Sequence, residues 1–229
     1  MNKSINVVDV IGWDIKNWSM ALDFWEKETS LDLSSALALE IGAGNGGLSL
    51  WMASKGAHVI CSDLNGPTQA ARDLHRRHDL QHLIDYQCVD ATNIPYTNYF
   101  DIVLFKSVLG GIGRNDNRDI QCRTIQEIYK SLKPGGELWF AENLVSTAFH
   151  QFCRRRFVKW GAYWRWVSIE EIVDFLKQFS HTSYITAGFL GTLGRSEKQR
   201  QLLGTLDQKI FNRLVPDHQK YIIIVAAKK

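Results

Sequence analysis

Several carboxylates follow short apolar runs in a pattern that suits the binding of a nucleoside. Glu40 stands just before the glycine-rich stretch Gly42-Ala-Gly-Asn-Gly46, and Asp63 and Asp90 each follow a later apolar run. A carboxylate at a strand end can accept hydrogen bonds from both ribose hydroxyls or from an amine. Glycines let the backbone turn sharply and approach a ligand without a Cβ in the way. These residue types indicate a site for a nucleoside-containing cofactor.

A strand and a helix are expected to hold the glycine-rich stretch in place. Residues 37–41 read as a buried strand, and a helix beginning at Gly47 would direct its free N–H groups into the same space. The spacing Gly42-x-Gly44-x-x-Gly47 also fits the dinucleotide fingerprint, and Asp63 lies where the acid that binds an NAD ribose belongs. An NAD-dependent oxidoreductase is therefore the first alternative.

Similar apolar runs recur at wide intervals along the chain. Further strands are predicted at 58–62, 84–89, 100–105, 137–141, 183–188 and 221–226, and helices at 119–132, 169–179 and 195–214. Strands alternating with helices imply right-handed crossovers and a parallel sheet. The last strand has no room for a crossover and is expected to run antiparallel. We predict an α/β fold, a Rossmann-like seven-stranded, mostly parallel sheet with helices on both faces, as a single domain over residues 1–229.

The composition excludes several classes of protein. The chain has 229 residues, of which 45% are hydrophobic and 22% charged, and its net charge of +3 is too small to indicate nucleic-acid binding. The four cysteines are scattered singly, so no metal site and no disulfide framework is expected. No run of 18 apolar residues occurs, and the first residues, 1–4, lack a signal pattern. We expect a cytoplasmic protein.

Three features argue against a dinucleotide. Glu40 would repel a pyrophosphate bound at the adjacent glycines. The stretch Asp90-Ala-Thr92 after the third predicted strand offers a contact for the edge of an adenine. The antiparallel last strand does not belong to a simple dinucleotide-binding domain.

Four successive motifs resemble those of class I S-adenosylmethionine-dependent methyltransferases. They are Glu40-Ile-Gly-Ala-Gly-Asn-Gly46, Asp63, Asp90-Ala-Thr92 and Leu132-Lys-Pro-Gly-Gly136, in the usual order and at normal spacing over about residues 36–141. The resemblance implies S-adenosylmethionine as the cofactor. This sulfonium zwitterion carries an adenosine and no phosphate, which agrees with the acidic residues around the glycines.

The resemblance also implies roles for particular residues. Glu40 would order the loop and the methionine ammonium, Asp63 would accept from the ribose hydroxyls, and Asp90 would accept from the adenine amine beside Ala91 and Thr92. The complete set of expected cofactor-binding residues is Trp18, Glu40, Gly42, Ala43, Gly44, Gly46, Asp63, Leu64, Asp90, Ala91, Thr92 and Lys106.

The residues after the fourth predicted strand bear on the methyl acceptor. Amino-methylating members of the family often carry Asn/Asp-Pro-Pro-Tyr/Phe there, whereas this chain reads Phe105-Lys-Ser-Val-Leu-Gly-Gly111. This departure favours a hydroxyl acceptor, for which a general base is useful. The expected catalytic residues are Lys106, whose pKa burial would lower, and Glu142 and His150 just past the fifth strand.

A basic, aromatic segment at Phe149–Trp166 lies where this family inserts substrate-recognition elements, so 142–182 is predicted to be a substrate-recognition insert. Its cations can attract an anion and its aromatic rings can stack on a sugar or base: Arg154, Arg155, Arg156, Lys159 and Arg165, with Trp160, Tyr163, Trp164 and Trp166. Alternatively, the segment lies on an anionic membrane surface, or packs on the sheet with its arginines solvated. The stretch Gly110–Gly113 either folds over the acceptor or is a turn before a helix.

The N-terminal residues 1–35 are expected to form a helical cap over the cofactor, with Trp18 and Ser19 as candidates to line its pocket. Two short sequence segments, Phe105–Gly113 and Trp164–Glu171, are similar to segments of methyltransferases encoded with bacterial surface-polysaccharide pathways. This likeness implies O-methylation of a sugar, free or linked to a nucleotide or lipid, and an anionic sugar conjugate as partner. A non-catalytic S-adenosylmethionine-binding protein stays open, as do peripheral membrane contact and a monomer or homodimer. RNA methylation is disfavoured by the low charge.

Overall fold

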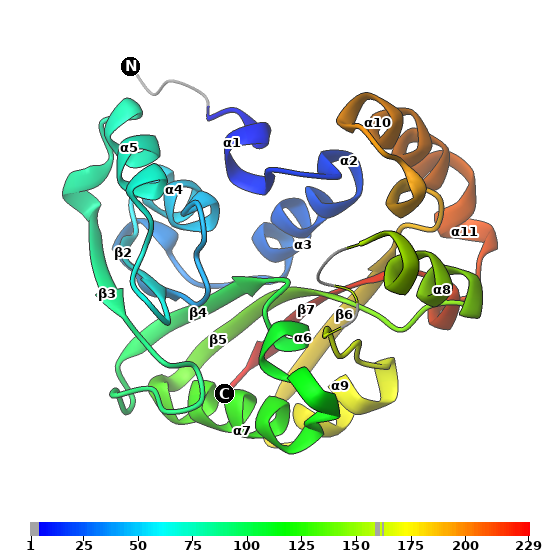
Figure 1. The fold of residues 1–229 in the computed structure, drawn as a ribbon. Helices are drawn as coiled ribbons and strands as arrows, with labels where there is room; N and C mark the ends of the chain where they lie inside the picture. Colours follow the sequence, from blue (N-terminus) through cyan, green and yellow to red (C-terminus); the bar gives the residue numbers. More distant parts are fainter. Residues whose placement is uncertain (1–4, 159–160, 162) are drawn as a thin grey trace.

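The computed structural model describes residues 5–158, 161 and 163–229, so Lys159 and Trp160 of the basic segment lie outside the described residues. Within the described part, seven strands form one sheet in the order β3-β2-β1-β4-β5-β7-β6 (Figure 1). The strands are β1 (Leu37–Glu40), β2 (His58–Asp63), β3 (Ile84–Cys88), β4 (Phe100–Lys106), β5 (Leu132–Asn143), β6 (His181–Ala187) and β7 (Ile222–Lys228). Strands β1 to β5 pair in parallel, whereas β7 runs antiparallel to both β5 and β6. The predicted fold class is confirmed.

The longer helices connect these strands and cover the sheet. They are α3 (Met20–Glu28), α4 (Gly47–Ser54), α5 (Gln69–Arg77), α7 (Arg118–Ser131), α8 (Ala148–Phe157), α9 (Ile169–Phe175) and α10 (Glu197–Leu206). Short helices are α1 (Val7–Ile11), α2 (Ile15–Trp18), α6 (Leu109–Ile112) and α11 (Asn212–Leu214). In Figure 1, α3 and α4 lie above the sheet and α7 below it, so helices cover both faces as expected.

A tryptophan cluster fixes α3 and α4 to the upper face. The ring centroids of Trp25 and Trp51 lie 6.0 Å apart, and each lies 6.1 Å from the ring of Trp139 on β5. Trp25 Nε1 donates to the carbonyl oxygen of Val225 on β7 at 2.9 Å, so its one polar atom is satisfied inside the core. The N-terminal segment is therefore anchored to the centre of the sheet.

On the lower face, α7 and α9 bury apolar side chains against the strands. Ile125 and Ile128 of α7 pack with Ile172 and Phe175 of α9 in one core cluster. Ser168 and Glu171 form the expected capping box, since each side chain bonds the backbone of the other. Because α9 covers the sheet and Val167 is buried in the same core cluster, the part of the predicted insert that stands outside the two layers is α8.

The segment predicted to be helical at 195–214 forms α10, a π-helical turn at Asp207–Phe211 and α11. It was expected to cover an edge of the sheet. Instead, α10 packs against α2, and a Cβ on Gly204 would lie 2.8 Å from the Lys16 Cβ. This contact places the C-terminal third of the chain beside the N-terminal helices, above the carboxyl ends of the strands (Figure 1).

No helix in the described ranges is both long enough and apolar enough to cross a membrane.

Candidate active site

A pocket of about 860 Å³ opens at the carboxyl ends of β1, β4 and β5. Its walls come from the glycine loop after β1, from α1 and the turn after it, from the tips of β4 and β5, and from α8 and the α10 region. The side chains at the three strand tips are Glu40, Lys106 and Asn143. In an open α/β sheet this edge, beside the point where strand order reverses, is where ligands bind.

The glycine loop brings bare backbone to the pocket. Gly42, Gly44 and Gly46 all have positive φ angles, of 61°, 54° and 73°. A Cβ on Gly42 would lie 2.8 Å from a methyl group of Val108, whereas a Cβ on Gly44 would meet nothing within 4 Å. Gly44 therefore faces open space, and a side chain there would occupy volume that a ligand can use.

Glu40 fastens the loop to the following helix. Its Oε2 accepts hydrogen bonds from the Ser49 backbone N–H at 2.7 Å and from the Ser49 hydroxyl. Burial raises the pKa of this carboxyl to about 7, against the opposing effect of these bonds and of nearby Lys106. The position agrees with the expected role of Glu40 in ordering the loop.

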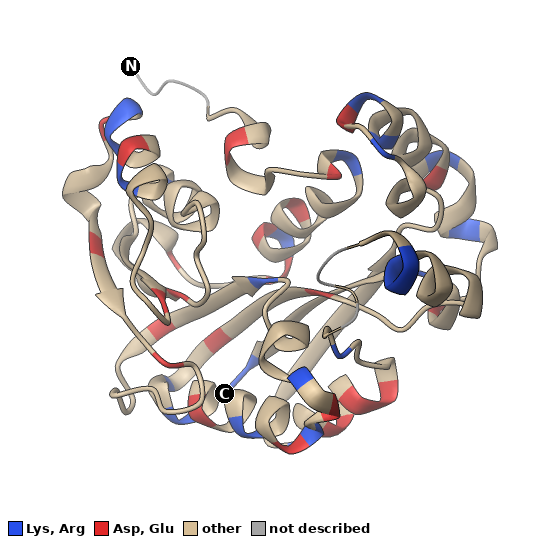
Figure 2. Cartoon of the chain, viewed as in Figure 1, with Lys and Arg blue, Asp and Glu red and all other residues tan. Residues whose placement is uncertain are grey.

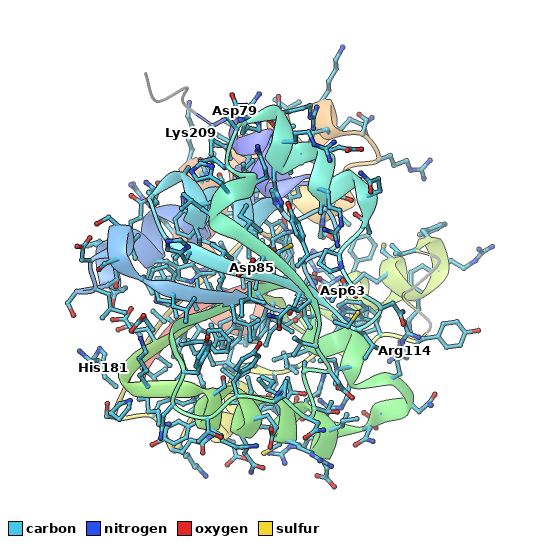
Figure 3. The ribbon with its side chains drawn as sticks, turned by 90° about the vertical axis from the view of Figure 1, so that its left-hand side faces the viewer. Asp63, Asp79, Asp85, Arg114, His181 and Lys209 are labelled. Atoms are coloured by element: carbon cyan, nitrogen blue, oxygen red, sulfur yellow. The ribbon has the colours of Figure 1, made fainter. Side chains whose placement is uncertain are left out.

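Asp63 supports the loop from the neighbouring strand. It lies at the end of β2 (Figure 3), and its Oδ2 accepts from the Gly44 backbone N–H at 3.2 Å. Asp63 itself is not part of the pocket wall, and the adjacent Leu64 is 62% exposed. The loop therefore stands between the pocket and the expected ribose acid.

The motif after β3 forms a local turn. Asp90 Oδ1 accepts from the backbone N–H of Thr92 at 2.8 Å and from its hydroxyl at 2.7 Å, while Ala91 is buried. Asp90 is exposed and lies outside the pocket wall. The structure thus divides the expected cofactor residues into two groups. Glu40, Gly42, Ala43, Gly44 and Lys106 line the pocket, whereas Asp63, Leu64, Asp90, Ala91 and Thr92 border the adjacent ends of β2 and β3, and Gly46 lies at the start of α4.

Lys106 occupies the tip of β4 beneath two indole rings. Its Nζ lies 5.2 Å from the ring centroid of Trp18 and 5.5 Å from that of Trp13. Burial lowers the pKa of Lys106 to about 8, with Glu40 and Glu142 acting in the opposite direction. Trp13, not the expected Trp18, lines the pocket, because Trp18 is fully buried behind Lys106.

The residue after Lys106 has a strained backbone. Ser107 has a φ of 57°, a conformation that non-glycine residues rarely adopt, and its hydroxyl accepts from Asn143 Nδ2 at 2.7 Å. Both side chains line the pocket. Sequence reasoning did not single out either residue, since the contact joins the tips of two strands.

Glu142 hydrogen-bonds the backbone of the turn that follows Lys106, from outside the pocket wall. Its Oε2 accepts from the backbone N–H groups of Val108 and Leu109, both at 2.8 Å, and its Oε1 accepts from the Asn143 N–H at 2.8 Å. Glu142 is fully buried and is not part of the pocket wall, and burial raises its pKa. The carboxylate therefore caps α6 and positions the Lys106 turn.

His150 also lies away from the pocket wall. Its Nδ1 bonds the Thr147 hydroxyl at 2.6 Å, and its Nε2 bonds the Phe189 carbonyl oxygen at 2.7 Å. Bonding to a carbonyl places the proton on Nε2. Burial lowers the pKa of His150, and both nitrogens are engaged, so the structure gives this side chain a structural position between α8 and the chain after β6.

Three arginines follow one another on α8 (Figure 2), but their environments differ. Arg154 is buried and lines the pocket, whereas Arg155 and Arg156 are exposed. Arg165 bonds Asp116 at 2.9 Å and Glu171 at 2.5 Å, which makes it part of the packing between α6 and α9. Of the aromatic residues described here, Trp164 lines the pocket, Trp166 is buried and Tyr163 is 68% exposed.

The Gly110–Gly113 stretch is a packing surface for Trp164. Most of it forms α6, and a Cβ on Gly110 would lie 1.8 Å from Trp164 Nε1. The Arg165 N–H also donates to the Gly110 carbonyl oxygen at 3.0 Å. The glycines allow an indole to lie directly on the helix, so Trp164 forms a fixed wall of the pocket.

No group of three metal-binding side chains comes together among residues 5–158, 161 and 163–229.

Residues 39–140 match the family model described as a methyltransferase domain. Over these residues the chain is similar to a methyltransferase domain. The match begins in β1 and ends in β5, and so includes the glycine loop, Asp63, the Asp90 turn and Lys106. No curated protein sequence matches the chain.

Solved structures similar to this chain are named for different activities. Phosphoethanolamine N-methyltransferase 2 of Haemonchus contortus, in complex with S-adenosylmethionine, has 20% identity and a TM-score of 0.63, over 93% of this chain and 52% of its own. Geranyl diphosphate C-methyltransferase of Streptomyces coelicolor A3(2) has 11% identity and a TM-score of 0.65, over 92% and 79%. The [4+2]-cyclase SpnF has 21% identity and a TM-score of 0.60, over 92% and 80%.

These similarities concern the fold. The chain spans about half the length of the Haemonchus protein, and one of the three similar structures is named for a cyclisation. A shared fold does not specify a substrate or a reaction, so both must be argued from the pocket of this chain.

Proposed function

We propose that this chain transfers the methyl group of S-adenosylmethionine to a hydroxyl group of a small molecule. The observation that carries the proposal is the continuity of the pocket, which reaches from Gly44 on the cofactor loop to Lys106 and Trp164. A volume of about 860 Å³ is within the range of small-molecule sites, so donor and acceptor can lie together.

The residues around the glycine loop suit this cofactor. The bare backbone of Gly44 leaves room for the methionine part, and Glu40 supplies a carboxylate near its ammonium. Asp63 and Asp90 stand in order along the ends of β2 and β3, where they would take the ribose hydroxyls and the adenine amine. When bound, the cofactor supplies a methyl carbon attached to a positively charged sulfur.

Lys106 is proposed as the general base. The acceptor oxygen forms a bond to the methyl carbon as the carbon–sulfur bond breaks, and the electron pair of that bond stays on sulfur. The hydroxyl proton passes to the neutral amine of Lys106. A pKa of about 8 gives this lysine a neutral fraction near physiological pH that an ordinary lysine lacks.

Neighbouring residues position the base and the acceptor. Glu142 fixes the turn after Lys106, and Asn143 donates to the Ser107 hydroxyl. Because Ser107 accepts that bond, its own O–H is available to donate to an acceptor oxygen. Holding the two reactants in line contributes much of the rate, since effective molarities reach about 10⁵–10⁸ M.

A sugar is the proposed acceptor class. One support is the similarity of the short segments Phe105–Gly113 and Trp164–Glu171 to methyltransferases encoded with surface-polysaccharide pathways. The other is the pair of indoles of Trp13 and Trp164 in the pocket wall, on which an apolar sugar face can stack. The similar structures reported above are named for other acceptors, so this assignment rests on the residues of this chain.

The test is transfer of a labelled methyl group from S-adenosylmethionine to a panel of sugars, sugar phosphates and nucleotide sugars. We expect label in a methyl ether whose formation is lost in Lys106→Met but not in Asp85→Ala, a change on the exposed side of β3. Tight binding of the cofactor with no transfer to the panel or to any small-molecule cell extract would instead support a non-catalytic binding protein.

A further inference from the structure

Arg154 is a buried cation whose hydrogen-bonding capacity is only partly used. It lies on α8, is 4% exposed, and donates through Nη1 to the Leu144 carbonyl oxygen at 2.6 Å. Its guanidinium lies 5.5 Å from the ring centroid of Trp166 and 5.9 Å from that of Tyr221. These contacts hold the side chain in one place.

The other end of the guanidinium has no hydrogen-bond partner among the residues that the structure describes. Nη2 is buried and makes no hydrogen bond with any described residue, and Arg154 forms no ion pair with a carboxylate in that part of the chain. Leaving a buried donor of a charged group unpaired is costly, so folded proteins rarely keep one without a purpose. Arg154 lines the pocket, where a ligand can supply the missing acceptor.

A second arginine faces the same pocket. Arg200 of α10 lines the wall, its Nε is buried without a partner among the described residues, and its guanidinium lies 5.9 Å from the ring of Trp13. Its nearest carboxylate, Glu197, is 3.7 Å away and already accepts from the Asp14 and Ile15 backbone N–H groups. Arginines from two distant elements therefore converge on one space.

The acidic residues of the pocket wall do not neutralise the part of the pocket that Arg154 and Arg200 line. They are Asp9, which pairs with His78, and Glu40, which is bonded to Ser49. Arg154 and Arg200 are left to give this part of the pocket a positive character, and Arg77 of α5 adds a further cation to the pocket wall. Such a site favours a carboxylate or a phosphate, both of which match the donor geometry of a guanidinium.

We propose that Arg154, assisted by Arg200, binds an anionic oxygen group of the methyl acceptor. This inference rests on the proposed function, because it assumes that the acceptor fills the pocket beside Lys106. Arg154 follows β5, which is two strands from β1 in the sheet, or about 10 Å at the usual strand spacing. The anion therefore belongs to the acceptor and not to the methionine part of the cofactor over β1.

The test measures binding and does not need the true acceptor. Calorimetry first measures S-adenosylhomocysteine binding to the full chain, and then inorganic phosphate and acetate are titrated into the saturated complex. In Arg154→Gln we expect phosphate affinity to fall at least about tenfold, with S-adenosylhomocysteine affinity within about twofold of wild type. Arg155→Gln, an exposed arginine on the same helix, is the matched control and should bind phosphate as wild type does.

Three results would overturn the proposal: no saturable binding of either anion to wild type, equal affinities in Arg154→Gln and wild type, or a tenfold loss of S-adenosylhomocysteine affinity in Arg154→Gln. The last result would assign Arg154 to the cofactor carboxylate. Arg154→Lys keeps a cation but not the planar donor fork, so it should show an intermediate loss and serves if the glutamine variant does not fold. Failure of wild type to bind S-adenosylhomocysteine would contradict the proposed function separately.

Discussion

The ammonium of Lys106 lies 5.2 Å from the ring centroid of Trp18, an indole that is itself fully buried. The lysine makes no ion pair with a carboxylate among the described residues, so its charge is stabilised mainly by aromatic faces and by more distant acids. Burial lowers its pKa to about 8 because these contacts only partly replace the lost hydration, and the side chain stays in the pocket wall.

The first prediction concerns the pH dependence of methyl transfer. Only neutral Lys106 can accept a proton, so kcat/KM should rise with pH and level off above about 8. Lys106→Met should lower kcat at least about 100-fold, and Lys106→Arg should do the same because its guanidinium stays protonated. A profile that is flat from pH 6.5 to 9, or full activity in Lys106→Arg, would show that Lys106 is not the base.

The second prediction concerns Asp63. The change Asp63→Ala removes the bond to the Gly44 N–H and the expected ribose contact, so S-adenosylhomocysteine affinity should fall at least about tenfold. Asp85, on the adjacent strand β3 (Figure 3), is exposed and outside the pocket wall. Asp85→Ala makes the same change in charge and should bind normally. Equal calorimetric affinities for the two variants would remove Asp63 from the cofactor site.

The third prediction concerns the packing of Trp164 on α6. A Cβ on Gly110 would lie 1.8 Å from the indole nitrogen, whereas one on Gly111 would lie 3.1 Å from the ring. We expect Gly110→Ala to lower the free energy of unfolding by about 1–3 kcal/mol, because the indole must move. Gly111→Ala gains the same helix propensity with a smaller clash, so it should change the free energy of unfolding little. Urea denaturation followed by circular dichroism measures both, and similar values for the two variants would contradict this packing.

The fourth prediction concerns a buried polar network that joins the N-terminal helices to the C-terminal third of the chain. The Tyr221 hydroxyl donates to Asp14 and accepts from Asn17 Nδ2 at 2.8 Å, and the same Nδ2 donates to Asp207 at 3.0 Å. Removing the hydroxyl in Tyr221→Phe leaves buried polar atoms unpaired. The free energy of unfolding should fall by about 1–3 kcal/mol.

This network also gives the stability a pH dependence. Burial raises the pKa of Asp14 from 3.8 to about 7, so the folded state binds the extra proton over this range. Stability contributed by Asp14 is therefore present below about pH 4 and is lost as pH rises through 7. Asp14→Asn lacks this titration and tolerates the φ of 44° at this position. The free energy of unfolding of wild type relative to Asp14→Asn should fall by up to about 4 kcal/mol between pH 4 and 7. If urea denaturation gives the same difference between the two proteins at both pH values, the raised pKa of Asp14 is contradicted.

The strand–loop–helix unit around Gly42 could be predicted because its signals are local. Apolar alternation, glycine spacing and the helix start at Gly47 all lie within one short segment. These features depend on backbone geometry, which sequence patterns report well.

The pocket wall could not be predicted in the same way. Arg200 reaches the pocket wall only because α10 packs on α2, and Trp13 lines that wall while Trp18 is fully buried in the core. Glu142 and His150 follow β5 as anticipated, but their hydrogen bonds to backbone groups hold them behind the wall. Such partners come from tertiary contacts and have no local sequence signal.

Calorimetry with S-adenosylhomocysteine and NAD⁺ tests the central claim most directly. In the variant Gly44→Asn, the asparagine tolerates the positive φ of this position, and its side chain would fill the cofactor space. The matched control is Gly135→Asn, because Gly135 lies outside the pocket, has a φ of 78° and has nothing within 4 Å of a Cβ. We predict that wild type and Gly135→Asn bind S-adenosylhomocysteine and not NAD⁺, and that Gly44→Asn loses at least about tenfold in affinity. Binding of NAD⁺ without S-adenosylhomocysteine, or normal binding by Gly44→Asn, would contradict a methyl-donor site at this loop.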